Sequence, residues 1–354
     1  MGAHSLNGSL ENSTLISTVT CQMSTDAGST AAQPDADAQR SIAPTNPATP
    51  KVVILLCTCN GERYLEEQLD SIFRQTYSKL EIHAADDCSQ DATIGILNKL
   101  KQHDSRLSTI THNQARKGFA ANFLSLVCNP AIEADFYAYS DQDDIWEADK
   151  IKRAFAWLET IPAETPALYC SRTQLVSPEN QTIGFSPLFR KTPAFANALV
   201  QNIGGGNTMV FNHAARKLLM LAGQDVVVVA HDWWTYLVVS GCGGRVFYDS
   251  YPSVRYRQHG HNLIGMNIGM QARFRRVRML FEGRLKIWTD MNIKALEKLR
   301  NQLTDESRAM LIRFTDARNC SLAPRLLRFQ QSGIYRQTLP GNLGLIAAAV
   351  FNRI

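Results

Sequence analysis

The feature that most constrains the fold is a regular alternation of apolar runs with helical patterns. Val52–Leu56 is continuously apolar, as expected for a strand of a parallel sheet that is covered on both faces. From about residue 62, apolar residues recur at the i, i+4, i+7 and i+8 spacing of one helical face. Further strands are expected at 80–85, 107–110 and 136–139, and further helices at 92–101, 119–127 and 147–158. This order predicts an α/β fold with a Rossmann-like, mostly parallel sheet flanked by helices.

Carboxylates follow two of these expected strands. Asp86 and Asp87 end the second strand, and a Ser-Asp-Gln-Asp-Asp-Ile-Trp stretch with Asp141, Asp143 and Asp144 follows the fourth. Open α/β sheets bind ligands at the carboxyl ends of their strands. Closely spaced carboxylates repel one another unless a cation lies among them, and Mg²⁺ or Mn²⁺ prefers such oxygen ligands. A solvated acidic turn that caps the next helix explains the same residues, so the stretch alone leaves both interpretations open.

Composition narrows the class of protein. The net charge of +5 does not suggest a nucleic-acid binder, but it suits phosphorylated substrates or an anionic membrane surface. Eight cysteines show no metal-binding spacing, which predicts reduced thiols in a cytosolic protein. We expect a cytoplasmic protein without a secretory signal or a membrane-spanning helix.

Three segments are expected along the chain. Residues 1–49 are rich in Ser, Thr, Ala, Gln and Pro and are predicted to be disordered. Residues 50–265 are expected to form the globular domain, and 266–354 a helical, basic extension that starts with several arginines and ends in the apolar run 343–351. This extension suits peripheral contact with the inner face of the cell membrane, and an ordinary solvated helix face explains it equally well.

Four segments, taken together, resemble the family 2 inverting glycosyltransferases with the GT-A fold, and most closely bacterial rhamnosyltransferases. They are Thr-Cys-Asn-Gly-Glu at 58–62, Asp-Asp-Cys-Ser at 86–89, the acidic stretch at 140–146 and His-Asp-Trp-Trp at 231–234. Phrases around residues 207–212 and 256–262 also match that branch, and the resemblance covers about 51–265. Many relatives carry a tyrosine where this chain has Cys59, so stacking of that side chain on the base is not expected here.

The resemblance implies roles for individual residues. The positions implied to bind the nucleotide sugar are Thr58, Asn60, Glu62, Asp86, Lys117 and Asp141. Asp143 would ligate the metal, and Asp144, Asn207 and His259 are further candidates. A helix N-terminal acid is the alternative for Asp86, and a solvated surface lysine is the alternative for Lys117. Three glycines, 204–206, precede Asn207 and allow positive φ and close approach of the backbone to a ligand, and a tight turn or bulge is the alternative.

Asp232 matches the family's catalytic base. It follows an apolar run, and the adjacent Trp233 and Trp234 suggest apolar walls around it or a platform for the acceptor. A carboxylate within reach of the acceptor hydroxyl can accept its proton. An N-cap of the following helix is the alternative.

The function expected from the resemblance is metal-dependent transfer of a sugar to a cell-surface polysaccharide or a lipid-linked glycan precursor. L-rhamnose from dTDP-L-rhamnose is the expected donor, and another dTDP- or UDP-linked sugar is the alternative. A nucleotidyltransferase would want a glycine- and lysine/arginine-rich phosphate loop, which 58–61 does not supply. A sugar- or nucleotide-binding module without turnover needs no base, so the presence of both Asp143 and Asp232 disfavours it.

Overall fold

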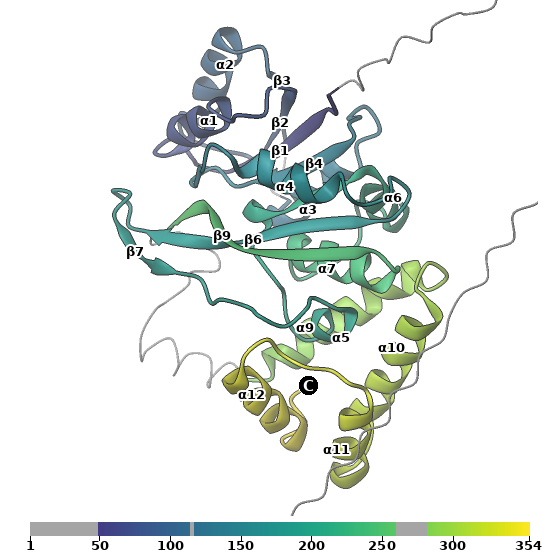
Figure 1. Cartoon of the computed structure of the whole chain (residues 1–354). Coiled ribbons are helices and arrows are strands. Elements are labelled where there is room, and N and C mark those ends of the chain that lie inside the picture. The colour runs from purple at the N-terminus through teal and green to yellow at the C-terminus, as the bar shows by residue number, and fades with distance from the viewer. Residues whose placement is uncertain (1–48, 114–116, 260–281) are drawn as a thin grey trace, which may run out of the picture. The chain divides into compact units, whose positions relative to one another are not determined.

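The first half of the sheet is parallel, as the alternation predicts (Figure 1). In the computed structural model, which describes residues 49–113, 117–259 and 282–354, the order across the sheet begins β3-β2-β1-β4. These strands are β1 (Val52–Thr58), β2 (Leu80–Asp86), β3 (Leu107–His112) and β4 (Phe136–Ser140). All residues of β1 are buried, which accounts for its continuous apolar run. The expected α/β fold is confirmed.

The helices after these strands are α1 (Leu65–Phe73), α2 (Thr93–His103), α3 (Phe119–Val127) and α4 (Lys150–Leu158). Of these, α3 spans the predicted residues 119–127, whereas α1, α2 and α4 begin later than the sequence predicts. Helix α4 begins at Lys150 rather than Glu147, because β5 (Ile145–Trp146) first pairs with a distant strand. The backbone N–H of Glu147 accordingly donates to the carbonyl oxygen of Ser253 in the sheet and not within a helix.

The second half of the sheet mixes both directions. Beyond β4 the order is β8-β6-β9-β5, and only the β6–β9 pair among these is parallel. The added strands are β6 (Ala167–Val176), β7 (Thr182–Phe185), β8 (Val210–Asn212) and β9 (Arg245–Arg257). The two strands expected at 245–248 and 254–256 are one strand, β9, whose register against β6 shifts around Pro252. A proline cannot donate to the ladder, and a bulge accommodates it.

The strand β1 divides the core into two layers, because successive side chains point to opposite faces. Val52, Ile54 and Leu56 pack with buried residues of α1, α2 and α4. Val53 and Leu55 pack on the other face with buried residues of α3 and of the later helices α6 (His213–Ala222) and α7 (His231–Gly241). The sheet is thus covered on both sides, which leaves the carboxyl ends of its strands as the place for a site.

Helices also form the end of the chain, as expected for the extension. They are α9 (Arg284–Leu296), α10 (Asp305–Arg318), α11 (Leu322–Gln331) and α12 (Leu339–Val350). They belong to the same compact unit, Thr49–Ile354, as the sheet. No helix within the described ranges is long and apolar enough to cross a membrane. The segment 1–48 and the arginines at 273–278 lie outside the described residues, and the boundary at 265 stays a prediction.

Candidate active site

The acidic stretch after β4 is a cluster of crowded carboxylates. Burial, together with repulsion from Asp143 and Asp232, raises the pKa of Asp141 to about 8. Burial also raises the pKa of Asp144, whose Oδ2 accepts a hydrogen bond of 2.5 Å from Nδ2 of Asn207. Since Asp144 is fully buried and Asp149 is the N-cap of α4, the stretch is not a solvated cap. Its carboxyl groups are instead gathered at the end of β4, where burial disfavours their charged forms.

Asp143 meets His259, which follows the end of β9. The distance between Oδ2 of Asp143 and Nε2 of His259 is 2.7 Å. The imidazole stacks on the ring of Tyr64, with 5.3 Å between the ring centroids. The buried guanidinium of Arg257 lies over the same tyrosine at 4.5 Å and donates to the carbonyl oxygen of Asp143. Tyr64 and Arg257 thus position this pair. Arg257 belongs to the matching phrase at 256–262, whereas no sequence motif singled out Tyr64.

A carboxylate–imidazole pair offers two ligands of the kind that divalent cations take. Within the described ranges, no group of three or more His, Cys, Asp or Glu residues is arranged to hold a metal ion. The remaining positions around a cation would therefore fall to a substrate or to water, as is usual for Mg²⁺.

Asp86 is a buried acceptor at the end of β2. Its carboxylate accepts hydrogen bonds from Thr58 Oγ1 at 2.8 Å and from Ser89 Oγ at 2.5 Å, and Nδ1 of His112 lies 2.9 Å away. Helix α2 begins only at Thr93, so Asp86 is not a helix N-terminal acid. The buried hydroxyl of Thr58 supports Asp86, while His112, which the sequence did not single out, is 44% exposed.

The turn after β1 is joined to the loop after β2 by two predicted residues. Asn60 has a left-handed φ of 51°, and its Oδ1 accepts from the backbone N–H of Gln90 at 2.8 Å. Oε2 of Glu62 accepts from the backbone N–H of Ala92 at 2.9 Å. Both side chains brace the loops that surround Asp86.

The side chain of Gln142 fixes the same turn against the acidic stretch. Its Oε1 accepts from the N–H of Cys59 at 2.7 Å, and its Nε2 donates to the carbonyl of Cys59 at 3.0 Å. A Cβ added at Gly61 would lie 2.3 Å from Oε1 of Gln142. The glycine in the 58–62 segment was thus the only sequence signal for this close approach.

Lys117 lies on the surface before α3. Its backbone N–H and that of Gly118 donate to the two carboxylate oxygens of Asp87, at 2.6 and 2.9 Å. Its side chain helps to line a cavity of about 560 Å³ together with residues such as Asn113 and Gln224. This cavity lies beside β3, α3 and α6 and not at the acidic stretch.

Asp232 lies half-buried in the first turn of α7. Oδ2 accepts from the backbone N–H of Gly206 at 3.1 Å, and burial raises the pKa of the carboxyl to about 6. Asp232 is not the N-cap, because that position is Ala230. The neighbouring residues Gly206 and Asn207 donate hydrogen bonds to Asp232 and Asp144 respectively, so the expected base lies beside the acidic stretch. Repulsion from Asp232 accordingly contributes to the raised pKa of Asp141.

The two tryptophans after Asp232 face the core rather than an acceptor. Trp234 is fully buried, and Nε1 of Trp233 donates to the carbonyl of Ala198 at 2.7 Å. The buried ring of His231 stacks on Phe123 with 3.8 Å between centroids, and burial lowers its pKa to about 3. The apolar surroundings of Asp232 therefore come from this packed layer.

None of residues 204–206 uses the positive φ that glycine allows, and the tight turn, which was the alternative for this run, is what forms. Gly206 instead starts a 3-10 turn, Gly206–Thr208, that brings it against α7. A Cβ there would lie 2.4 Å from Nε2 of His231, so the close approach is to the protein itself.

Residues 53–219 match the profile described as Glycosyl transferase family 2. The chain is 29% identical over 267 residues to the dTDP-rhamnosyl transferase RfbG of Shigella flexneri, an alignment that covers 71% of this chain and 86% of that protein. It is 31% identical over 109 residues to the UDP-Glc:alpha-D-GlcNAc-diphosphoundecaprenol beta-1,3-glucosyltransferase WfaP of Escherichia coli, which covers 31% of this chain and 41% of that protein. Among solved structures, S. aureus TarS 1–349 in complex with UDP-GlcNAc is similar with a TM-score of 0.49 and 14% identity, over 80% of this chain and 90% of that chain.

Proposed function

The chain belongs to glycosyl transferase family 2 through residues 53–219 and is a glycosyltransferase, and we propose that it moves a sugar from a nucleotide donor to a glycan hydroxyl with inversion. The observation that carries this proposal is the meeting of Asp232 with the acidic stretch. A half-buried carboxylate whose pKa is raised to about 6 lies close enough to Asp141 to raise the pKa of that residue. Perturbed carboxyl groups of this kind are typical of catalytic sites.

The proposed donor is dTDP-L-rhamnose, and its support is the similarity to a dTDP-rhamnosyl transferase over most of both chains. A UDP-linked sugar is the second candidate, supported by the shorter similarity to a UDP-glucose enzyme. We assign the nucleotide to the loops braced by Asn60, Glu62 and Asp86, with Lys117 near the nucleotide and Asp141 near its ribose. Because Asp86 is fully buried, it would act through the groups it holds, Ser89 and the half-exposed His112.

A divalent cation, Mg²⁺ or Mn²⁺, fits the residues present. Asp143 and His259 would hold it, and Asp144 with Asn207 would keep the stretch in place. Positive charge there would relieve the repulsion among the carboxylates that burial makes costly. When bound, the cation would offset the negative charge of the donor's diphosphate.

Asp232 is proposed as the general base. With a pKa of about 6 its carboxylate is ionised at neutral pH and can accept the proton of the acceptor hydroxyl. The hydroxyl oxygen then forms a bond to C1 of the sugar on the face opposite the nucleotide. The bond between C1 and the phosphate oxygen breaks, its electron pair leaves with the nucleoside diphosphate, and the configuration at C1 inverts.

The acceptor is proposed to be a precursor of a cell-surface polysaccharide, free or lipid-linked, on the cytoplasmic side of the membrane. The support is again the similarity to enzymes named for rhamnosyl transfer and for an undecaprenol-linked substrate.

A screen of the purified protein against nucleotide sugars tests this function, with nucleoside diphosphate release measured with and without a divalent cation. Cation-dependent release from dTDP-L-rhamnose is expected. Release of pyrophosphate would indicate a nucleotidyltransferase, and tight donor binding without turnover in the presence of glycan acceptors would indicate a binding module.

A further inference from the structure

Helix α12 is apolar on two faces. Leu345, Ala348 and Ala349 are buried against the protein. The opposite face carries large apolar side chains at the i, i+4, i+7 and i+11 spacing of one helical side: Leu339 (74% exposed), Leu343 (60%), Ile346 (56%) and Val350 (39%). A helix that packs on one side normally shows water a polar face. The outward face of α12 is therefore apolar, although a helix face exposed to water is usually polar.

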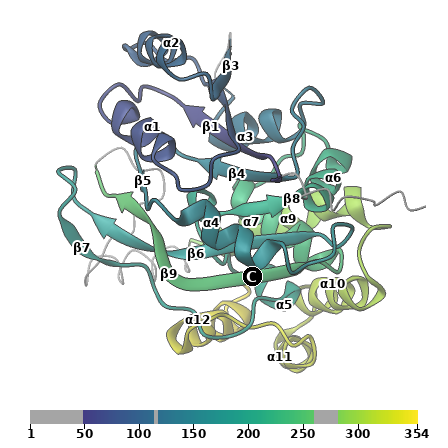
Figure 2. The ribbon, with the colours of Figure 1, turned by 45° about the horizontal axis from the view of Figure 1, so that its top comes forward.

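Helix α11 continues this apolar face. Its exposed leucines are Leu322 (49%), Leu326 (36%) and Leu327 (57%). The buried guanidinium of Arg325 donates to the carbonyl oxygens of Ala349 in α12, at 3.0 Å, and of Cys320, at 2.7 Å. The bond to Ala349 joins the two helices. Figures 1 and 2 both show α11 and α12 at the end of the molecule opposite β3. We call the seven exposed residues of α11 and α12 the C-terminal apolar surface.

The charge around this surface has one sign. Residues 319–354 contain four arginines and no aspartate or glutamate. Arg328 and Arg353 are exposed, and Lys191 reaches the same region because its Nζ donates to the carbonyl of Arg336. Apolar side chains flanked by cations and free of acids are the pattern of segments that lie on anionic bilayers.

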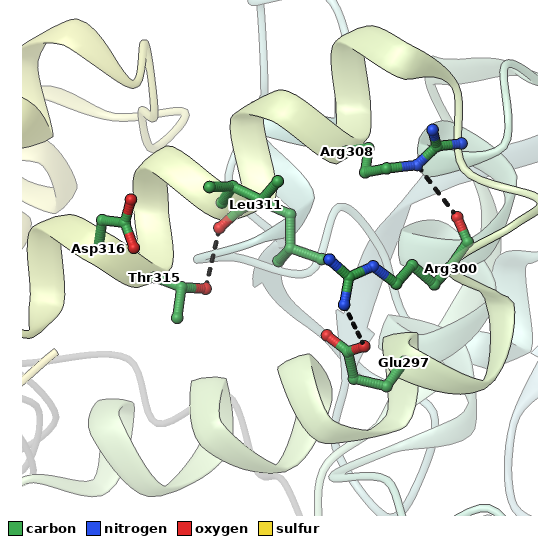
Figure 3. Close-up of a pocket in the computed structure, with 7 residues that line it drawn as sticks. Glu297, Arg300, Arg308, Leu311, Thr315 and Asp316 are labelled. Atoms are coloured by element: carbon green, nitrogen blue, oxygen red, sulfur yellow. Dashed lines mark hydrogen bonds and ion pairs between the residues drawn. The ribbon is translucent and has the colours of Figure 1, made fainter.

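The neighbouring hollow on α10 is different. A cavity of about 180 Å³ lies between Glu297–Leu299 and α10. Figure 3 shows residues that line it, among them Arg300, which pairs with Glu297. Arg308, which also lines it, pairs with Asp305. Its cations are already paired with acids of the same chain, whereas no ion pair of Arg328 or Arg353 is found within the described ranges.

We propose that the C-terminal apolar surface docks the enzyme on an anionic lipid bilayer, with its leucines among the acyl chains and Arg328 and Arg353 at the headgroups. An anionic bilayer explains both the exposed apolar side chains and the positive charge beside them. A protein partner for this surface would need no excess of one charge. The proposal places the sugar transfer at a membrane surface. It does not depend on the proposed function, since vesicle binding needs neither donor nor acceptor.

Co-sedimentation of the full chain with phosphatidylcholine vesicles, with and without phosphatidylglycerol, tests the proposal. Binding is expected only with phosphatidylglycerol and is expected to weaken as salt rises. Leu343→Glu is expected to lower the partition coefficient by roughly tenfold or more, because a leucine leaves the lipid and a negative charge faces the anionic headgroups. Leu221→Glu on α6 is the matched control, as Leu221 is 59% exposed and lies outside this surface.

A second variant covers the case in which Leu343→Glu does not fold. Arg328→Gln combined with Arg353→Gln leaves the leucines in place and is expected to reduce binding to phosphatidylglycerol vesicles. Asp232→Asn is expected to bind vesicles as the unaltered chain does, which separates this proposal from the proposed chemistry. Equal binding by all variants, or a dimer in sedimentation velocity that Leu343→Glu dissolves without any vesicle binding by the unaltered chain, would overturn it.

Discussion

The backbone N–H of Gly206 donates a hydrogen bond to Oδ2 of Asp232 at 3.1 Å. This bond requires the two segments to approach so closely that a Cβ on residue 206 would lie 2.4 Å from Nε2 of His231. His231 cannot easily yield, because it is buried and stacked on Phe123. The glycine therefore sets the place of one oxygen of the proposed base.

Gly206→Ala is expected to lower kcat by about 100-fold while donor affinity changes little, since a small displacement of a catalytic group has effects of this size. Single-turnover transfer and calorimetric donor binding on one preparation would measure both. Gly95→Ala on α2 is the control, because nothing lies within 4 Å of its added Cβ. An unchanged kcat in Gly206→Ala would mean that the bond to Asp232 does not position the base.

Asp232→Asn is expected to lower kcat by a factor on the order of 10²–10⁴, because the amide keeps the shape but accepts no proton. The ionised carboxylate is the active form, so kcat of the unaltered enzyme is expected to rise with pH through about 6 and then level off. Donor affinity should be kept, since the base faces the acceptor. Near-normal transfer by Asp232→Asn would reject the assignment, and a loss of both affinity and fold would make Asp232 structural.

Asp143→Ala and His259→Ala are each expected to abolish most of the transfer and to weaken cation-dependent binding of the nucleoside diphosphate. The physical reason is that the pair, 2.7 Å apart, supplies the two proposed ligands of the cation. Calorimetry with and without chelator measures the effect on binding. Asp149→Ala, an N-cap variant outside the pair, serves as the control carboxylate. Full activity of the unaltered enzyme in chelator would contradict the metal proposal.

Gly61→Ala and Gln142→Ala are expected to have the same effect, a higher KM for the nucleotide sugar. In the first variant the new Cβ displaces the amide of Gln142, and in the second the amide is removed, so both lose its two bonds to Cys59. Each of these hydrogen bonds stabilises the ordered conformation of the turn by about 1 kcal/mol. Steady-state kinetics of the two variants beside Gly95→Ala would test this, and a KM that rises in only one of them would separate the glycine from the amide.

Lys150→Met is expected to raise the melting temperature at pH 7 and to have less effect near pH 10. Burial lowers the pKa of Lys150 from 10.5 to about 7, and within the described ranges its Nζ has no hydrogen-bond partner. The unfolded chain therefore binds the proton more tightly, and this group's contribution to stability rises with pH between about 7 and 10.5 and is least favourable below 7. Melting curves at both pH values test the sign. A variant that is less stable at pH 7 would show that the attraction to Asp144 outweighs the cost of burial.

The local sequence was sufficient to predict the α/β fold class of the protein. The apolar run Val52–Leu56 and the apolar patterns that follow it have the spacings of strands and helices, and these spacings predict the elements in their order. The carboxylates fall at the strand ends because Asp86 and Asp141 directly follow apolar runs, and the family's segments lie in the same places. The resemblance to family 2 follows from these residues without any coordinates.

The tertiary structure alone decided which side chains serve the site and which support it. The amide of Gln142 reaches Cys59 across 83 residues, and His259 reaches Asp143 across 116. Such pairs depend on how the strands are ordered and in what register, which a local pattern of apolar residues does not record. For the same reason the sequence left open whether the glycine run faces a ligand or forms a tight turn, whereas the structure shows that Gly206 leaves no room for a Cβ beside His231. Periodicity is a property of neighbours along the chain, and an active site is a property of neighbours in space.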